Sequence, residues 1–196
     1  EEHLSPIAKN DPFLQMLLDL KIDEVTQNKQ ILIQRNDFFL INKEERKKTP
    51  ITFEDNDDLP RSLLKQVEIN TISASFPFLI TQLCRLHQNC SEQKKIGPIV
   101  KNNPTKHIAT SFAEAHESYG SENGIILFVT QQKENNRFDQ IGLEQLLWDT
   151  YKIKTVRKSL PEIFHSCFLR NGHLVLDGQI VSITYYRAGY SPNDFT

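Results

Sequence analysis

The sequence KQVEINTISASF, residues 65–76, starts as an alternating, β-prone strand and ends in small and hydroxyl-bearing residues. Glu68 and Asn70 are two positions apart, so both side chains point to the same face of such a strand. A carboxylate and an amide oxygen on one face suit a Mg²⁺ ion that carries a nucleotide. The same spacing also fits an ordinary strand followed by a turn, and spacing alone does not separate the two interpretations.

The composition is that of a globular protein without a nucleic-acid or membrane partner. The chain has 196 residues, enough for one domain or two small ones. Its net charge of −2 offers no basic field for nucleic acid, and no apolar run approaches the ~20 residues of a membrane-spanning helix. Its three cysteines cannot all pair, which favours ordinary thiols in a reducing compartment. We therefore expect a cytoplasmic protein.

A β-α-β pattern marks the second half of the chain. Residues 125–129 form a continuous apolar run, as expected of a buried parallel strand. Residues 139–151 have a helical pattern that offers Ile141 and Trp148, among others, to the core. The returning strand contains Val156. This pattern predicts an α/β fold with a parallel sheet.

Three further elements are predicted around this unit. Residues 78–86 are predicted as a buried helix, and residues 107–119 as an amphipathic helix that ends at Gly120. Residues 173–185 alternate around an Asp-Gly pair, which is typical of a tight hairpin.

The first third of the chain is predicted to hold one helix and short strands. Asp11 precedes a proline, the usual start of a helix. The apolar runs at residues 31–33 and 38–41 predict two strands on either side of Arg35. Residues 43–60 combine a basic run, an acidic run and prolines, which indicates a solvated loop.

Several segments together resemble one protein family. They are NDPF (residues 10–13), QRNDFF (34–39), EINTISASF (68–76), NNPTK (102–106), QQKENNRFDQ (131–140) and RAGYSP (187–192). In sequence and order they are similar to motifs of the eukaryotic glutathione synthetases. The chain departs from the family at Asn135, where members often have arginine, and at Ala188, where vertebrate members have aspartate.

The resemblance implies the N-terminal part of an ATP-grasp ligase joined to a βαβ-containing substrate-binding domain. It places the N-terminal portion of the catalytic domain at residues 1–119 and the substrate-binding domain, incomplete at its C-terminus, at residues 120–196. It also implies that the chain is a fragment, without the start of the protein and without the C-terminal ATP-grasp portion.

The family joins γ-glutamylcysteine to glycine with ATP through an acyl phosphate, and its members are homodimers. The resemblance therefore implies γ-glutamylcysteine, glycine and ATP as ligands, Mg²⁺ as cofactor and a second copy as partner. We expect residues 1–196 alone to be inactive. An ATP-grasp site needs a glycine-rich loop over the phosphates, and the seven glycines of the chain form none.

The resemblance also assigns site residues. The implied dipeptide-binding residues are Ile72, Ser73, Ala74, Ser75, Glu134, Asn135, Asn136, Gln140, Arg187, Ala188, Gly189 and Tyr190. Glu68 is implied to contact ATP and Mg²⁺, and Asn70 to contact Mg²⁺. Arg35 is implied to bind substrate and to act as the catalytic arginine near the reacting centre.

The reaction chemistry fits these residue types. Arg187 can hold a carboxylate through two parallel hydrogen bonds, and Glu134 can meet an ammonium group. A fixed cation at Arg35 would stabilise charge that develops on phosphoryl and tetrahedral oxygens. The segments that carry Ser73, Glu134 and Arg187 each follow a predicted strand, where open α/β sheets bind ligands.

Two alternatives stay open. A close variant would join a different amino acid in place of glycine. A non-catalytic relative would keep the fold and bind a peptide or a partner protein. The presence of both Glu68 and Asn70 argues against this second alternative.

Overall fold

The computed structural model describes residues 3–20, 29–40, 64–71, 73–95, 97, 99–121 and 123–195 of the 196-residue chain. Two predictions lie outside these described residues, namely the solvated loop at 43–60 and the dipeptide contact at Ile72. Within the described ranges, no helix has the length and apolar character needed to cross a bilayer.

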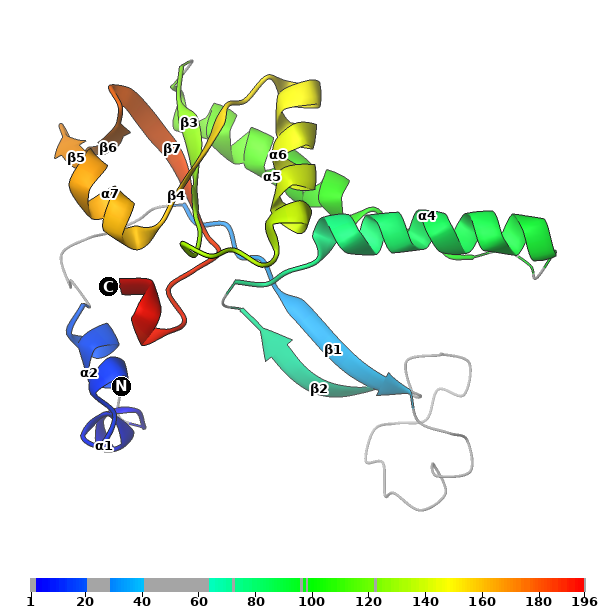
Figure 1. Cartoon of the computed structure of the whole chain (residues 1–196), viewed down its shortest axis with the longest axis horizontal. Helices are drawn as coiled ribbons and strands as arrows, with labels where there is room; N and C mark the ends of the chain where they lie inside the picture. Colours follow the sequence, from blue (N-terminus) through cyan, green and yellow to red (C-terminus); the bar gives the residue numbers. More distant parts are fainter. Residues whose placement is uncertain are drawn as a thin grey trace.

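A five-stranded sheet in the order β4-β3-β7-β6-β5 lies at the centre of the fold (Figure 1). Its strands are β3 (Ile125–Val129), β4 (Thr155–Lys158), β5 (Cys167–Arg170), β6 (His173–Leu176) and β7 (Gln179–Tyr186). β3 is parallel to β4 and β7, whereas β6 is antiparallel to β5 and β7. The fold is therefore mixed α/β, and the expectation of a parallel sheet holds only for β4-β3-β7.

The turn between β6 and β7 explains the antiparallel part. Asp177 and Gly178 have φ angles of 49° and 79°, the left-handed conformation that a two-residue hairpin turn requires. Such a short connection can join only antiparallel neighbours. The hairpin prediction is thus confirmed. A second tight turn, at Asn171 and Gly172, joins the antiparallel strands β5 and β6, and the two turns together make the sheet mixed.

The main hydrophobic core lies between the sheet and two helices. These helices are α5 (Pro104–Tyr119) and α6 (Arg137–Tyr151). Phe112 of α5 and Phe128 of β3 each meet the ring of Tyr185 of β7 edge to face at 5.0 Å. Leu147 of α6 is fully buried beside them. The predicted domain division after residue 119 stays a prediction.

The β3-α6-β4 unit agrees with the sequence pattern, but two apolar side chains of α6 are not in the core. Ile141 is 37% exposed and Trp148 is 54% exposed. Both lie on the outer face of the helix because one stripe alone, with Leu143 and Leu147, reaches the sheet.

The other face of the sheet carries a helix that the sequence analysis missed. α7 (Leu160–Ser166) packs Leu160 and Ile163 against the buried face of β3 and β6. Ser159 and Glu162 form a reciprocal capping box at its start. The helix has only seven residues, too few for a clear helical period.

A two-stranded antiparallel ribbon extends from the body (Figure 1). It consists of β1 (Arg35–Leu40) and β2 (Leu64–Asn70). The predicted strand around Glu68 is therefore confirmed. The predicted strand at residues 31–33 is wrong, since these residues are not in a strand and pair with no neighbour in the described sheets.

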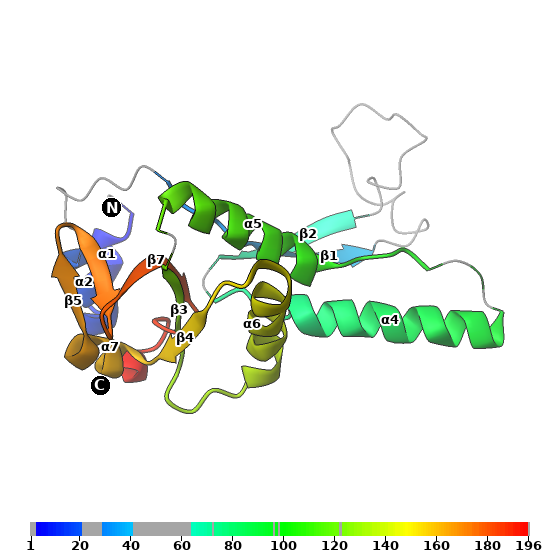
Figure 2. The ribbon, with the colours of Figure 1, turned by 90° about the horizontal axis from the view of Figure 1, so that it is seen from above.

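Helix α4 (Pro77–Lys94) also projects from the body, as both views show (Figures 1 and 2). Only Pro77, Thr81 and Ser91 are buried in it. The prediction of a buried helix at residues 78–86 is wrong in burial, because Leu83 is 49% exposed and Leu86 is 56% exposed. Helix α4 packs on α5 and α6 through its first turns, and the rest of it extends away.

Two short helices begin the chain, α1 (Ser5–Ala8) and α2 (Pro12–Asp19). The Asp11 carboxylate accepts bonds from two backbone N–H groups of α2, as the sequence predicted. Phe13 of α2 meets Phe195 edge to face at 5.8 Å. Phe195 belongs to η2 (Pro192–Phe195), a 3₁₀ turn that follows β7. Helix α5 ends at Gly120 with φ 79°, as predicted.

Candidate functional site

Three loops meet at one small cavity. One follows β2, one follows β3 and one follows β7. The cavity has a volume of about 160 Å³ and is lined by Ser73, Ser75, Glu134, Asn136, Arg187 and Tyr190. Because β3 and β7 are parallel neighbours, their carboxyl ends lie side by side, and Arg187 N–H donates to Val129 O at 2.7 Å. The structure thus brings together six residues that the sequence analysis placed in the dipeptide site.

The Arg187 guanidinium holds the β2 loop in place. Its side chain is almost fully buried, with 3% of the residue exposed. Nη1 donates to the carbonyl oxygens of Ser73 and Ala74, and Nη2 donates to Ser75 Oγ at 2.6 Å. The sequence suggested that this guanidinium clamps a substrate carboxylate with two nitrogens. In the structure those nitrogens bind the loop, and Nε alone is without a partner.

Four buried side-chain polar atoms are without a hydrogen-bond partner among the described residues. They are Ser73 Oγ, Gln140 Oε1, Gln140 Nε2 and Arg187 Nε. Leaving such an atom unpaired costs about 1–3 kcal/mol, so native structures tolerate few of them. All four belong to residues that the family resemblance assigns to the dipeptide. Ser73 and Arg187 line the small cavity, whereas Gln140 lies in α6 and is not in the lining. The unpaired atoms of Ser73 and Arg187 mark the cavity as prepared for a polar ligand.

The β3 loop contributes an acid to the cavity. Glu134 accepts a hydrogen bond from the Asn136 backbone N–H at 2.7 Å, and both residues line the cavity. Asn135, between them, is exposed and is not part of the lining.

The β7 loop contributes an aromatic ring. Burial, together with the negative charges of Asp194 and Glu134, raises the pKa of Tyr190 above its usual value. Its neighbour Ala188 is buried in the apolar cluster of β3 and β6, so its side chain packs in the core and does not face the cavity.

Asp194 fixes the β7 loop and was missed by the sequence analysis. Its carboxylate accepts from Gly189 N–H at 2.8 Å, from Ser191 N–H at 3.2 Å and from Gln131 Nε2 at 3.0 Å. Burial opposes its ionisation, but these hydrogen bonds outweigh burial and hold its pKa below the usual value. The carboxylate therefore ties the loop after β7 to the loop after β3.

A second polar cluster lies on the β1-β2 ribbon. The pairing of Arg35 with Asn70 and of Asp37 with Glu68 across the two strands places all four side chains together. Arg35 binds Asp37 at two points, Nε to Oδ1 at 2.9 Å and Nη2 to Oδ2 at 3.1 Å. This contact raises the pKa of Arg35 and lowers that of Asp37.

Asn70 links the two carboxylates of this cluster. Its Nδ2 donates to Glu68 Oε1 at 3.0 Å and to Asp37 Oδ2 at 3.2 Å. The bond between Glu68 and Asn70 confirms that both side chains share one face. Asp37 was not selected from the sequence, although it lies two positions after Arg35 on the same face.

The ribbon cluster meets the β2 loop through one ring. The Arg35 guanidinium carbon lies 5.8 Å from the ring centroid of Phe76, within range of a cation–π contact. Phe76 directly follows Ser75, which lines the cavity. The two groups of predicted residues are thus joined through the end of this loop.

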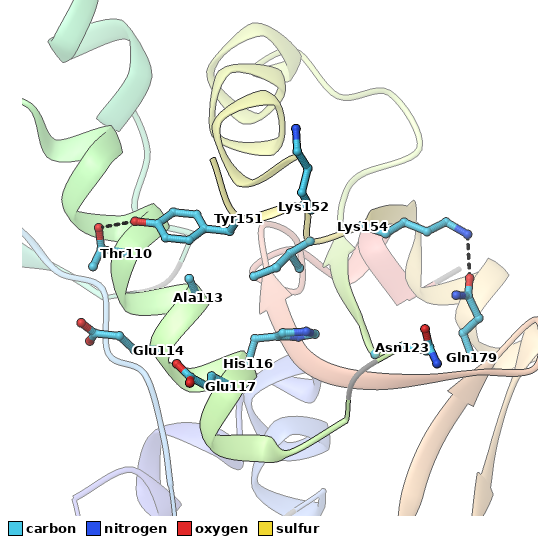
Figure 3. A pocket seen from close by; sticks show the side chains of 12 residues that line it. Thr110, Ala113, Glu114, His116, Glu117, Asn123, Tyr151, Lys152, Lys154 and Gln179 are labelled. Carbon is cyan, nitrogen blue, oxygen red and sulfur yellow. Dashed lines mark hydrogen bonds between the residues drawn. The ribbon is translucent and has the colours of Figure 1, made fainter. Parts of the chain in front are cut away.

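A larger cavity lies elsewhere, at the amino end of β3 (Figure 3). It measures about 640 Å³ and contains none of the predicted site residues. Several polar side chains in its wall already have partners, since Tyr151 bonds Thr110 at 2.8 Å and Lys154 bonds Gln179 at 2.6 Å. We therefore place the candidate site at the smaller cavity, where buried polar atoms are unpaired.

His116, in the wall of the large cavity, predicts a pH effect. Its Nδ1 lies 2.6 Å from Ser182 Oγ, and burial lowers the pKa of its imidazole. In the unfolded chain this histidine has its ordinary pKa of about 6.5. As the pH falls through that value, the unfolded chain takes up the proton before the folded chain does, so the stability of the folded state decreases. Urea unfolding is expected to show that His116→Asn loses less stability between pH 7.5 and pH 5.5 than the wild type does. The exposed His107→Asn on the same helix is the control, and equal losses in all three proteins would contradict the assignment.

Known proteins resemble this chain along most of its length. The family profile described as eukaryotic glutathione synthase matches residues 124–196. The chain is 34% identical over 206 residues to the chloroplastic glutathione synthetase of Solanum lycopersicum, across 100% of this chain and 35% of that protein. It is 34% identical over 204 residues to the glutathione synthetase of Homo sapiens, across 100% of this chain and 40% of that protein.

A solved structure shares the fold. The apo form of a glutathione synthetase-like effector from Globodera pallida matches with a TM-score of 0.65 and 20% identity, over 81% of this chain and 37% of that chain. The chain spans 35–40% of the length of the two curated relatives. With 34% identity to these two relatives along the whole chain and a family profile on residues 124–196, the chain is similar to the eukaryotic glutathione synthetases.

Proposed function

We propose that this chain forms the dipeptide-binding part of an ATP-grasp ligase that joins γ-glutamylcysteine to glycine and gives glutathione. The observation that carries the proposal is the set of unpaired buried polar atoms on Ser73, Gln140 and Arg187. The likeness to these relatives supports it, because they are glutathione synthetases by name.

The cavity suits the charges of the dipeptide. γ-Glutamylcysteine carries two carboxylates and one ammonium group. The Ser73 hydroxyl and the free Nε of Arg187 offer donors to a carboxylate, while Glu134 offers an acceptor to the ammonium. Donors and an acid thus surround one cavity from three different loops.

The proposed reaction has two steps. The cysteinyl carboxylate of the dipeptide takes the γ-phosphoryl group of ATP, which releases ADP and leaves an acyl phosphate. The glycine amine then attacks the acyl carbon, loses a proton and expels inorganic phosphate. We assign Arg35 to this centre because its guanidinium is fixed by Asp37 while its side chain is 32% exposed, so a bound oxyanion can reach it.

The ribbon cluster fits a magnesium ion in its type of donor. Glu68 and Asp37 provide carboxylates and Asn70 provides an amide oxygen, the ligand types that Mg²⁺ prefers. The described residues hold no group of three or more His, Cys, Asp or Glu side chains placed for a metal, so nucleotide phosphates would complete the shell. When bound, the ion would neutralise phosphate charge.

The proposal is tested by calorimetric titration with γ-glutamylcysteine, run beside an assay of dipeptide-dependent ADP release. We expect saturable binding at one site per chain and no ADP release from residues 1–196 alone. No binding of the dipeptide would refute the proposal. ADP release from residues 1–196 would contradict the expectation that a further phosphate-binding loop is required.

The alternative function is the binding of a peptide or a partner protein without catalysis. It also predicts dipeptide binding without turnover, so the same assay is repeated on a polypeptide extended to the length of the relatives. Glutathione formation there supports the ligase. Binding without glutathione formation favours the alternative.

Homodimer formation and a cytoplasmic location stay predictions. The relative from Solanum lycopersicum is chloroplastic by name.

A further inference from the structure

One buried carboxylate outside the predicted site holds the loop on which the site is built. Asp139 lies in the first turn of α6 with 2% of its surface exposed. Its Oδ2 accepts from Phe76 N–H at 2.9 Å. Its Oδ1 accepts from Phe78 N–H at 2.9 Å and from Leu79 N–H at 3.2 Å. All three partners are at least 60 residues away in sequence.

Two of these amides begin helix α4. The first N–H groups of a helix have no partner within it and usually find one in the side chain of the N-cap residue. The N-cap of α4 is Phe76, whose side chain cannot accept a hydrogen bond. Asp139 supplies the missing acceptor from a different helix, and its negative charge is favourable at a helix N-terminus.

The third amide fixes an unusual backbone conformation. Phe76 has φ 80°, in the left-handed region that bulky residues rarely adopt. Its N–H bond to Asp139 ties the backbone in this conformation, and its ring then lies near the Arg35 guanidinium at 5.8 Å.

The loop is therefore held at both ends. Arg187 binds the carbonyl oxygens of Ser73 and Ala74, and Asp139 binds the N–H of Phe76. Ser75 lies between these two anchors, and its side chain lines the cavity. Asp139 itself does not line the cavity.

We propose that Asp139 is a positioning residue for the candidate site. It sets the loop at residues 73–76 so that Ser75 faces the dipeptide cavity while Phe76 meets Arg35, which joins the dipeptide site to the catalytic cluster. It acts through the loop and touches no ligand. Its effect on ligand affinity rests on the proposed function, whereas its effect on the loop does not.

Two substitutions separate these contacts. Asparagine has one accepting oxygen, and its amide nitrogen can only donate. In Asp139→Asn, one orientation of the side-chain amide keeps the bonds from Phe78 and Leu79 and loses the bond from Phe76. The opposite orientation keeps the bond from Phe76 and loses the other two. Asp139→Ala loses all three. Asp149→Asn, an exposed position on the same helix, is the matched control.

The test combines two measurements on the whole chain. Amide hydrogen exchange, followed by NMR without ligand, is expected to be at least tenfold faster at Phe76, Phe78 or Leu79 in Asp139→Asn. The amide of Leu127 in the core should exchange as in the wild type, which shows that the effect is local. Calorimetry is expected to give a dissociation constant for γ-glutamylcysteine roughly tenfold weaker in Asp139→Asn, and weaker still in Asp139→Ala.

The two proposals fail in different ways. Unchanged exchange at all three amides, or an affinity equal to that of Asp149→Asn, would overturn the positioning role. If the wild type does not bind the dipeptide, the proposed function fails, and the exchange measurement alone decides whether Asp139 positions the loop. Faster exchange at Leu127 as well would show a global loss of structure and would also overturn the positioning role.

Discussion

Arg187→Ala is expected to abolish measurable γ-glutamylcysteine binding and to destabilise the chain. The substitution removes the buried cation that holds Ser73 O, Ala74 O and Ser75 Oγ. The partly buried carbonyl oxygen of Ser73 and the buried carbonyl oxygen of Ala74 then lose their charged donor. At about 1–3 kcal/mol for each such loss, the free energy of unfolding should fall by about 3 kcal/mol. Calorimetry gives the affinity, and urea unfolding gives the stability.

The control for this substitution is Arg157→Ala. Arg157 also forms a partly buried ion pair, with its Nε 2.6 Å from Glu144 Oε1, but it lies in β4, away from the cavity. The Arg157→Ala variant should lose some stability and keep its affinity for the dipeptide. If Arg187→Ala binds γ-glutamylcysteine as well as Arg157→Ala does, the guanidinium is not needed to form the site.

Gly142→Ala is expected to have the largest effect on the packing between α4 and α6. A Cβ atom at residue 142 would lie 2.1 Å from the Phe78 ring, so the ring would have to move. Such overpacking costs about 1–3 kcal/mol, and it would displace the start of α4 next to the bonds from Asp139. Urea unfolding measures the loss of stability, and hydrogen exchange at Phe78 reports the displacement.

A double-mutant cycle with Phe78→Ala tests the cause. Phe78→Ala alone leaves a cavity, and the added methyl group of Gly142→Ala then has room. The double variant should therefore be more stable than the sum of the two single losses predicts. Strict additivity would show that the cost of Gly142→Ala does not come from the Phe78 ring.

Hydrophobic and turn patterns were enough to predict the centre of the fold. The run at residues 125–129 is buried at all five positions, and the Asp177-Gly178 turn is where the sequence placed it. Burial of α4 could not be predicted in the same way. Its apolar side chains resemble a core stripe, but whether a stripe is covered depends on which elements pack on it. The short α7 and the missing strand at 31–33 fall below the length at which periodicity is informative.

The candidate site shows a similar division. Motif order predicted which loops carry Ser75, Glu134 and Arg187, and the structure brings these loops to one cavity. The three acids that hold the clusters together, Asp37, Asp139 and Asp194, were not selected. Asp139 and Asp194 are buried and accept bonds from backbone N–H groups, whereas Asp37 binds side chains of the ribbon. Neither burial nor these bonds have a local sequence signal. The quoted motifs contain Asp37 and Asp139, so attention to every polar residue of a matched motif would have found two of the three.

The most direct test of the central claim is a map of backbone amide chemical shifts as γ-glutamylcysteine is added to the chain. We expect the largest shifts at Ser75, Asn136 and Tyr190, one from each loop around the small cavity. The amides of Lys152 and Lys154 at the large cavity should stay unchanged. Shifts that gather at the large cavity, or none at all, would contradict the claim that these three loops form a dipeptide site.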